Sequence, residues 1–171
     1  MNRYLQIAGC AFGVLLASAC SSGGGSAYQK SATPGGNTAA PATNTAPNMT
    51  GPAGVMATQN SLGTILTDLH GRAVYLFEAD KASTSTCTDR CAQQWPPLTT
   101  TGTPAAGAGA NTALLATSAR HDGTTQLTYN GHPLYYYDDD RGPGTTAGQG
   151  ENSFGAKWYV LNPAGLKIDN D

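Results

Sequence analysis

The chain has 171 residues, of which only 12% are charged, and its formal net charge at pH 7 is −2. From residue 59 onward seven basic residues stand against eleven acidic ones, a net charge of −4, which argues against nucleic acid or an anionic lipid surface as a partner because both require clustered positive charge. The length allows one small domain with a core of its own behind a long N-terminal extension.

Residues 1–19 are predicted to be a secretory signal. Arg3 and the amino terminus provide positive charge, an apolar run occupies residues 7–16, and small residues follow it. This run is too short to cross a membrane as a helix, so the pattern indicates export rather than a membrane-spanning segment.

Cys20 is the expected lipidation site and the first residue of the mature protein. The sequence L-A-S-A-C that ends at Cys20 resembles a bacterial lipobox, although Ala17 stands where leucine is usual. Acyl chains contribute about 0.8 kcal/mol per buried methylene, so several chains would anchor the protein permanently. Ser21 in place of aspartate favours the outer membrane if the host has two membranes. Ordinary cleavage near Ala19, which would release a soluble exported protein, is the alternative.

Residues 20–58 are predicted to be a disordered tether. Beyond Cys20 they are almost entirely Ser, Gly, Ala, Thr, Pro, Asn and Gln, a composition that cannot bury enough apolar surface to offset the entropy of ordering. A coil of about 38 residues has a root-mean-square reach of roughly 35 Å. The folded domain is therefore expected over residues 59–171, near a membrane but not pressed onto it.

The first part of this domain is expected to be a hairpin followed by a short helix. Residues 62–67 and 73–77 are rich in β-branched, aliphatic and aromatic side chains and flank a turn at Gly71. A short helix near residues 87–94 would end at Pro96. The low-complexity stretch 99–112 is expected to be an exposed, mobile connection.

The second part is expected to contain three antiparallel strands and a closing hairpin. Asp122-Gly123 and Asn130-Gly131 are turn signals, and the second is typical of two-residue hairpin loops, so residues 118–137 should form successive strands. Residues 158–168 are expected to close the domain as a hairpin that turns at 162–165.

A short pattern occurs twice and indicates a duplicated structural unit. G-R-A-V-Y-L-F-E-A-D at 71–80 and G-H-P-L-Y-Y-Y-D-D-D at 131–140 have glycine, aliphatic, tyrosine, aromatic and aspartate in the same order. The two repeats are expected at about 61–98 and 118–161. Both faces of each motif strand are apolar, so these strands should be central and covered on each side. The matching positions are Tyr75, Phe77 and Asp80 in the first copy and Tyr135, Tyr137 and Asp140 in the second.

Cys87 and Cys91 have two possible roles. An exported protein in an oxidising compartment is expected to join them in a disulfide, which would fix a loop locally. The same C-x-x-x-C spacing occurs in thiolate copper sites, because soft thiolates select copper. However, Trp95 occupies the position where the oxidase pattern requires histidine. The disulfide is therefore the main expectation, and a redox or copper-handling role is kept as the alternative.

Other candidate chemistry is weaker. Asp80 and Asp140 are expected to fasten the loops that follow them rather than to converge as a glycosidase pair. Residues 138–140 suggest calcium, but the EF-hand spacing fails because Gln149 stands at the twelfth position. The three histidines are expected on surface turns, and neither a G-x-S-x-G elbow nor a phosphate-binding loop is present. The three histidines are His70, His121 and His132.

Taken together, the motifs resemble a known family. The resemblance covers residues 62–161 and rests on four features. These are the lipobox, the duplicated Tyr-x-aromatic-x-x-Asp, C-x-x-x-C-A-x-x-W-P-P-L from Cys87, and D-G-x-x-Q-x-T-Y-N-G-x-P-L-Y from Asp122. They are similar to bacterial secreted lipoproteins named for a repeated Y-x-[FWY]-x-x-D motif. The resemblance implies an exported tandem-repeat β protein without an established activity. An electron-transfer setting associated with some such proteins keeps the redox alternative open.

The sequence thus predicts a small all-β, antiparallel domain of two pseudo-equivalent hairpin repeats with at most a short helix. We expect a non-enzymatic structural or binding module of the cell envelope, held at the membrane through its lipid, with no cofactor, no metal and no nucleic-acid partner. The sequence does not identify a protein or small-molecule partner.

Overall fold

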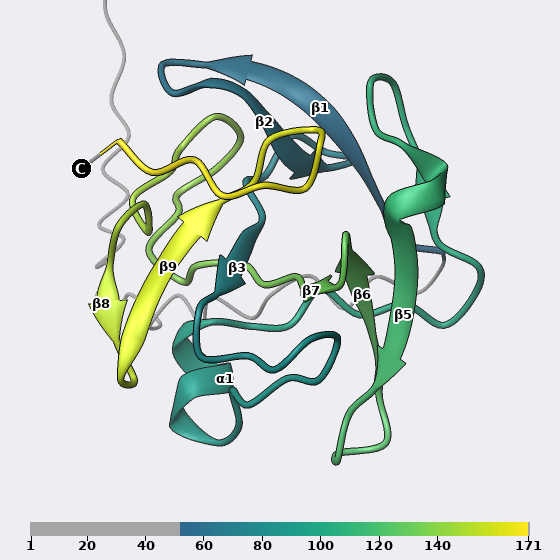
Figure 1. The fold of residues 1–171 in the computed structure, drawn as a ribbon, viewed down its shortest axis with the longest axis vertical. Coiled ribbons are helices and arrows are strands. Elements are labelled where there is room, and N and C mark those ends of the chain that lie inside the picture. The colour runs from purple at the N-terminus through teal and green to yellow at the C-terminus, as the bar shows by residue number, and fades with distance from the viewer. Residues whose placement is uncertain (1–51, 171) are drawn as a thin grey trace, which may run out of the picture. The chain divides into compact units, whose positions relative to one another are not determined.

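The computed structural model describes residues 52–170, and these form short strands with very little helix (Figure 1). The expected all-β class with two repeats is confirmed. Within the described residues no helix is long and apolar enough to span a membrane. The lipidation site expected at Cys20 and most of the expected tether lie outside the described residues.

The first sheet contains a strand that the sequence analysis missed. β1 (Gly54–Asn60) pairs antiparallel with β2 (Gly63–Asp68), and β4 (Ala105–Ala106) joins the other side of β1 in parallel. The boundary expected at residue 58 is therefore wrong, since β1 begins earlier. Its sequence G-V-M-A-T-Q-N has nearly the composition of the tether, so only its pairing with β2 distinguishes it.

The expected connection 99–112 is also partly ordered in this sheet. Within it, β4 forms where the Ala105 amide donates to the Ala53 carbonyl and the Gly107 amide to the Val55 carbonyl. A low-complexity composition can still supply a strand when a neighbouring edge offers free carbonyls and amides.

A second sheet brings the end of the chain back to the first motif. It has the order β3-β9-β8, from β3 (Tyr75–Phe77), β9 (Ala156–Val160) and β8 (Asn152–Ser153). β3 was expected to pair with residues 62–67, but its full partner is β9; only residues 66–68 and 72–74 still bond around Gly71. The closing hairpin after β9 forms as expected, with the Gly165 amide donating to the Asn162 carbonyl.

The third sheet has the expected order and antiparallel direction, but its first strand begins before residue 118 and the strand expected over 133–137 ends at Pro133. β5 (Leu115–Ala119), β6 (Thr125–Tyr129) and β7 (His132–Pro133) run antiparallel in chain order after the short 3-10 helix η1 (Thr112–Leu114). Asn130 and Gly131 have φ of 49° and 81°, the left-handed conformation that a two-residue hairpin turn of this type requires. The expected helix is α1 (Arg90–Gln94), which Pro96 and Pro97 prevent from continuing.

β3 lies at the centre of the domain, between β9 and β7 (Figure 1). One apolar cluster covers each of its faces, and both clusters also include residues of the second motif segment, which is a strand only at His132–Pro133. The expected burial on both sides therefore holds for both motif segments. The first cluster includes Val74, Leu76, Leu134 and Tyr136, and the second includes Tyr75, Phe77, Tyr135 and Tyr137.

Candidate functional site

The two motif tyrosines meet where the repeats face each other. The Tyr75 amide donates to the Tyr135 carbonyl at 2.9 Å, and the Tyr135 amide donates back to the Tyr75 carbonyl at 3.0 Å. Neither residue is exposed to solvent. This reciprocal pair is the arrangement expected at a pseudo-twofold axis that relates two copies of one unit.

Each motif tyrosine bonds to the motif aspartate of the other repeat, and we call these the exchanged tyrosine–aspartate pairs. The Tyr75 hydroxyl donates to Asp140 Oδ2 and the Tyr135 hydroxyl donates to Asp80 Oδ2, both at 2.7 Å. Each carboxylate also holds the loop that follows it, because the Thr86 amide donates to Asp80 Oδ1 and the Ala147 amide to Asp140 Oδ1. Burial raises the pKa of both Asp80 and Asp140 above its ordinary value. The aspartates therefore act as fasteners between and within the repeats.

The aromatic motif residues also pack on rings of the other repeat. Phe77 of the first repeat stacks on Trp158 of the second at 4.0 Å between ring centroids, and Tyr137 of the second packs on Trp95 of the first at 4.3 Å. The two tryptophans stack face to face at 3.9 Å with 2° between their planes. Four rings thus form a continuous column across the junction of the repeats.

The comparison with protein families accounts for this duplicated geometry. Residues 56–99 and 116–162 match a family described as a secreted repeat of unknown function. The chain belongs to this secreted-repeat family. The two matched segments together contain every residue of the exchanged tyrosine, aspartate and tryptophan pairs. No curated protein and no solved structure matches the chain.

The expected disulfide of this secreted repeat is present. Cys87 and Cys91 are bonded, with their Cα atoms 5.2 Å apart, and Cys91 is the first-turn residue of α1 that the bond ties to the preceding loop. Cys87 has no exposed surface and Cys91 is 6% exposed. Among residues 52–170 no group of three or more His, Cys, Asp or Glu side chains is arranged to hold a metal ion.

The other candidate residues are divided between the surface and the core of the domain. His70 and His121 are exposed, whereas His132 is half-buried and its pKa is lowered by burial. In the acidic run 138–140, Asp139 forms an ion pair with exposed Arg141 at 2.8 Å, and Asp140 accepts a hydrogen bond from the Tyr75 hydroxyl. The run is therefore divided between a surface ion pair and a core fastener.

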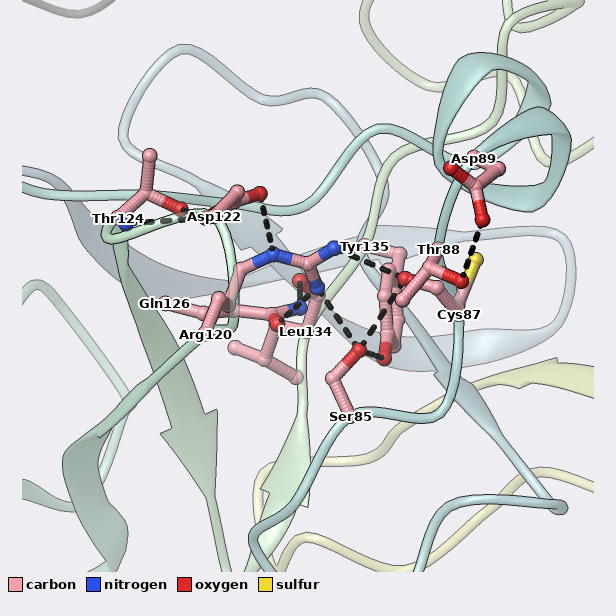
Figure 2. Close-up of polar contacts among 10 residues, drawn as sticks. All are labelled: Ser85, Cys87, Thr88, Asp89, Arg120, Asp122, Thr124, Gln126, Leu134 and Tyr135. Carbon is pink, nitrogen blue, oxygen red and sulfur yellow. Dashed lines mark hydrogen bonds and ion pairs between the residues drawn. The ribbon is translucent and has the colours of Figure 1, made fainter.

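Arg120 is the site residue that the sequence analysis did not single out. Its side chain is only 4% exposed, although it carries a full charge. Figure 2 shows its guanidinium at the centre of a polar cluster, donating to the Asp122 carboxylate, the Ser85 hydroxyl, the Gln126 amide oxygen and the Cys87 carbonyl. The cluster joins the disulfide loop of the first repeat to β5 and β6 of the second.

Further hydrogen bonds connect this cluster to its surroundings. The Ser85 hydroxyl also bonds to the Tyr135 hydroxyl at 2.8 Å, so Arg120 is linked through Ser85 to the tyrosine–aspartate pair. The Asp122 carboxylate accepts hydrogen bonds from the Thr124 amide and hydroxyl. These two bonds contribute most to lowering the pKa of Asp122 to about 2, and Arg120 contributes less. No sign of the role of Arg120 is visible in the sequence, because a single arginine whose partner Ser85 lies 35 residues away forms no repeated or local pattern.

A cavity of about 450 Å³ lies against this cluster. The loop before α1 forms one wall and the end of β5 with its following turn forms the other. Arg120, His121 and Asp122 border it on one side, and Ser85, Thr88 and Asp89 on the other.

Proposed function

We propose that this secreted repeat is a lipid-anchored module of the cell envelope that works by binding or by supporting other components, without catalysing a reaction. Membership of a secreted family supports the export part of this proposal. The anchor and the absence of catalysis are proposed from the residues of the chain.

The exchanged tyrosine–aspartate pairs are the observation that carries the proposal. A catalytic carboxylate must be free to reach a substrate, as in the two-carboxylate glycosidases. Here Asp80 and Asp140 each accept one tyrosine hydroxyl and at least one loop amide. The recurring polar groups of the motif therefore serve the fold, which supports a scaffold rather than a reaction centre.

The anchor is proposed at Cys20. The lipobox-like L-A-S-A-C places this cysteine after an apolar signal, and Ser21 favours the outer membrane of a host with two membranes. A membrane is thus the proposed partner through the lipid alone. The acidic domain is proposed not to bind nucleic acid, since that requires clustered positive charge.

Metabolic labelling with a palmitate analogue tests the anchor. The wild-type chain should incorporate label and sediment with membranes, whereas Cys20→Ser should remain unlabelled and soluble after export. Label in Cys20→Ser, or none in the wild type, would contradict the anchor.

Thiol and copper titrations test the non-redox part. The folded, oxidised protein should react with no thiol reagent, and its reduced form should not bind Cu(I) stoichiometrically. Tight Cu(I) binding, or a reduction potential near that of the compartment, would instead support a redox or copper-handling protein that uses Cys87 and Cys91.

A further inference from the structure

We infer that the cavity beside Arg120 is a binding site for a neutral, hydroxyl-rich ligand, that is, a saccharide. This inference rests on the proposed function of a non-catalytic envelope module and names the chemical class that such a module would bind. The cavity volume of about 450 Å³ lies within the range of small-molecule sites and has room for one or two sugar rings.

Arg120 gives the cavity a fixed donor. Four of the five N–H groups of a guanidinium are used here: Nε on Asp122, two on Ser85 and Gln126 through Nη1, and one on the Cys87 carbonyl through Nη2. The fifth N–H, on Nη2, has no acceptor among the described residues, and Arg120 is one of the residues that line the cavity. Because the side chain is 4% exposed, it loses little entropy when a ligand accepts from it.

Asp89 provides an acceptor on the opposite wall, where it accepts a hydrogen bond from the Thr88 hydroxyl through one carboxylate oxygen (Figure 2). It stands at the first position before α1, where an aspartate normally caps the helix, yet its side chain makes no capping bond. Its second carboxylate oxygen accepts no hydrogen bond from the residues that the structure describes.

The backbone of Asp89 is strained in a way that the helix does not explain. Its φ of 51° and ψ of −118° lie outside the regions open to ordinary side chains. Such strain persists only where the surrounding structure enforces it, often beside ligands. At this position the strained backbone sets the carboxylate on the cavity wall instead of on the amides of α1.

The charge balance of the walls selects a neutral ligand. The titratable side chains of the walls are Arg120, His121, Asp89 and Asp122. A phosphate or carboxylate near Arg120 would also meet the two aspartates, and an amine near Asp89 would also meet Arg120. A sugar hydroxyl donates and accepts at once, so it can donate to Asp89 while accepting from Arg120 or from the hydroxyls of Thr84 and Thr88. Ser85 is already engaged by Arg120 and Tyr135 and completes the wall.

Titration followed by amide NMR of the isotope-labelled folded protein tests the inference. The neutral probes are glucose, maltose, N-acetylglucosamine and chitobiose, with glucose 6-phosphate and glucosamine as charged counterparts. At least one neutral probe should shift amides in 84–92 and 119–122 in a saturable way, and its charged counterpart should bind more weakly. Shifts confined to other parts of the domain, no shift with any neutral probe, or tighter binding of a charged one would overturn the inference.

Matched variants separate binding from folding. Asp89→Asn and Asp89→Gly should each weaken binding about tenfold or more, the loss of one charge-assisted hydrogen bond. Asp89→Gly should at the same time keep or raise the melting temperature, because glycine adopts positive φ without strain. Ala92→Leu, which fills the cavity from α1, should block binding without removing any polar group.

Asp139→Asn is the control, since Asp139 is an exposed carboxylate that does not border the cavity. It should bind as the wild type does. Wild-type affinity in both Asp89→Asn and Ala92→Leu would overturn the site. Turnover of a bound sugar would instead contradict the proposed non-catalytic function while leaving the site in place, so the two failures are distinguishable.

Discussion

The hydroxyl groups of Tyr75 and Tyr135 are both predicted to stabilise the domain, because each bonds to the motif aspartate of the other repeat. Tyr75→Phe removes the donor to Asp140, and Tyr135→Phe removes the donor to Asp80. Tyr75→Phe leaves an oxygen of the buried Asp140 without its partner, and Tyr135→Phe does the same at the half-buried Asp80, so we expect a loss of about 1–3 kcal/mol in the free energy of unfolding for each. Urea denaturation monitored by tryptophan fluorescence measures it.

Tyr159→Phe is the matched control for these variants. Tyr159 is also buried, but its ring lies beside Lys167 and its hydroxyl makes no hydrogen bond within residues 52–170. This substitution should change the free energy of unfolding by less than about 0.5 kcal/mol. If Tyr75→Phe is equally harmless, the exchanged pair does not hold the repeats together.

At the scale of single elements, the disulfide fixes the loop that leads into α1. It closes a five-residue loop between Cys87 and Cys91. The chain-entropy model gives about 2 kcal/mol for a loop of this length, so the Cys87→Ala, Cys91→Ala double variant should lose about that much. Thermal unfolding with and without reductant checks the value. A protein that is unaffected by reduction, once reduction is verified by mass, would contradict a structural role for the bond.

Gly148 is predicted to be required by the aromatic column. A Cβ atom at this position would lie 2.6 Å from Trp95 Cη2 and 3.0 Å from the Tyr137 ring. Gly148→Ala should therefore cost about 1–3 kcal/mol through overpacking and alter tryptophan fluorescence. Gly102→Ala is the control, because its nearest neighbour would be 4.0 Å away. Equal stability of the two variants would show that the column can shift without cost.

The elements that could be predicted are those whose signal is local. The hairpin at Asn130-Gly131 depends on two residues that accept positive φ, and both were visible in the sequence. In contrast, β3 contains only three residues and finds its partner β9 about eighty positions later. β1 resembles the tether in composition, so its place in the fold depends on a partner strand rather than on its own residues.

The same distinction applies to the candidate site. The duplication identified the six motif positions, because two copies of one pattern constrain each other. It could not show that each tyrosine bonds to the aspartate of the other repeat, which depends on how the halves pack. Arg120 and Asp89 occur once each, and their roles arise only when the disulfide loop and the turn after β5 come together.

At the scale of the whole domain, buried tyrosines make the fold sensitive to high pH. Burial raises the pKa of Tyr75, Tyr135 and Tyr136, and the nearby carboxylates of Asp140, Asp80 and Asp68 raise them further. A folded-state pKa above the unfolded value means that the native state binds more protons. The stabilising contribution is therefore complete below about pH 10, the ordinary tyrosine pKa, and is lost as the pH rises above it.

We therefore predict that alkaline unfolding is cooperative and coupled to tyrosine ionisation. Above about pH 10 the free energy of unfolding should fall by about 1.4 kcal/mol per pH unit for each such tyrosine, because the unfolded chain ionises first. Phenolate absorbance and far-ultraviolet circular dichroism, recorded together, should show these tyrosines ionising only as the sheets unfold. Tyr136→Phe should make the decline shallower by the contribution of one tyrosine. If all phenolates form near pH 10 while the circular dichroism stays native, these rings are accessible to solvent and the packing of the repeats against each other is not as described.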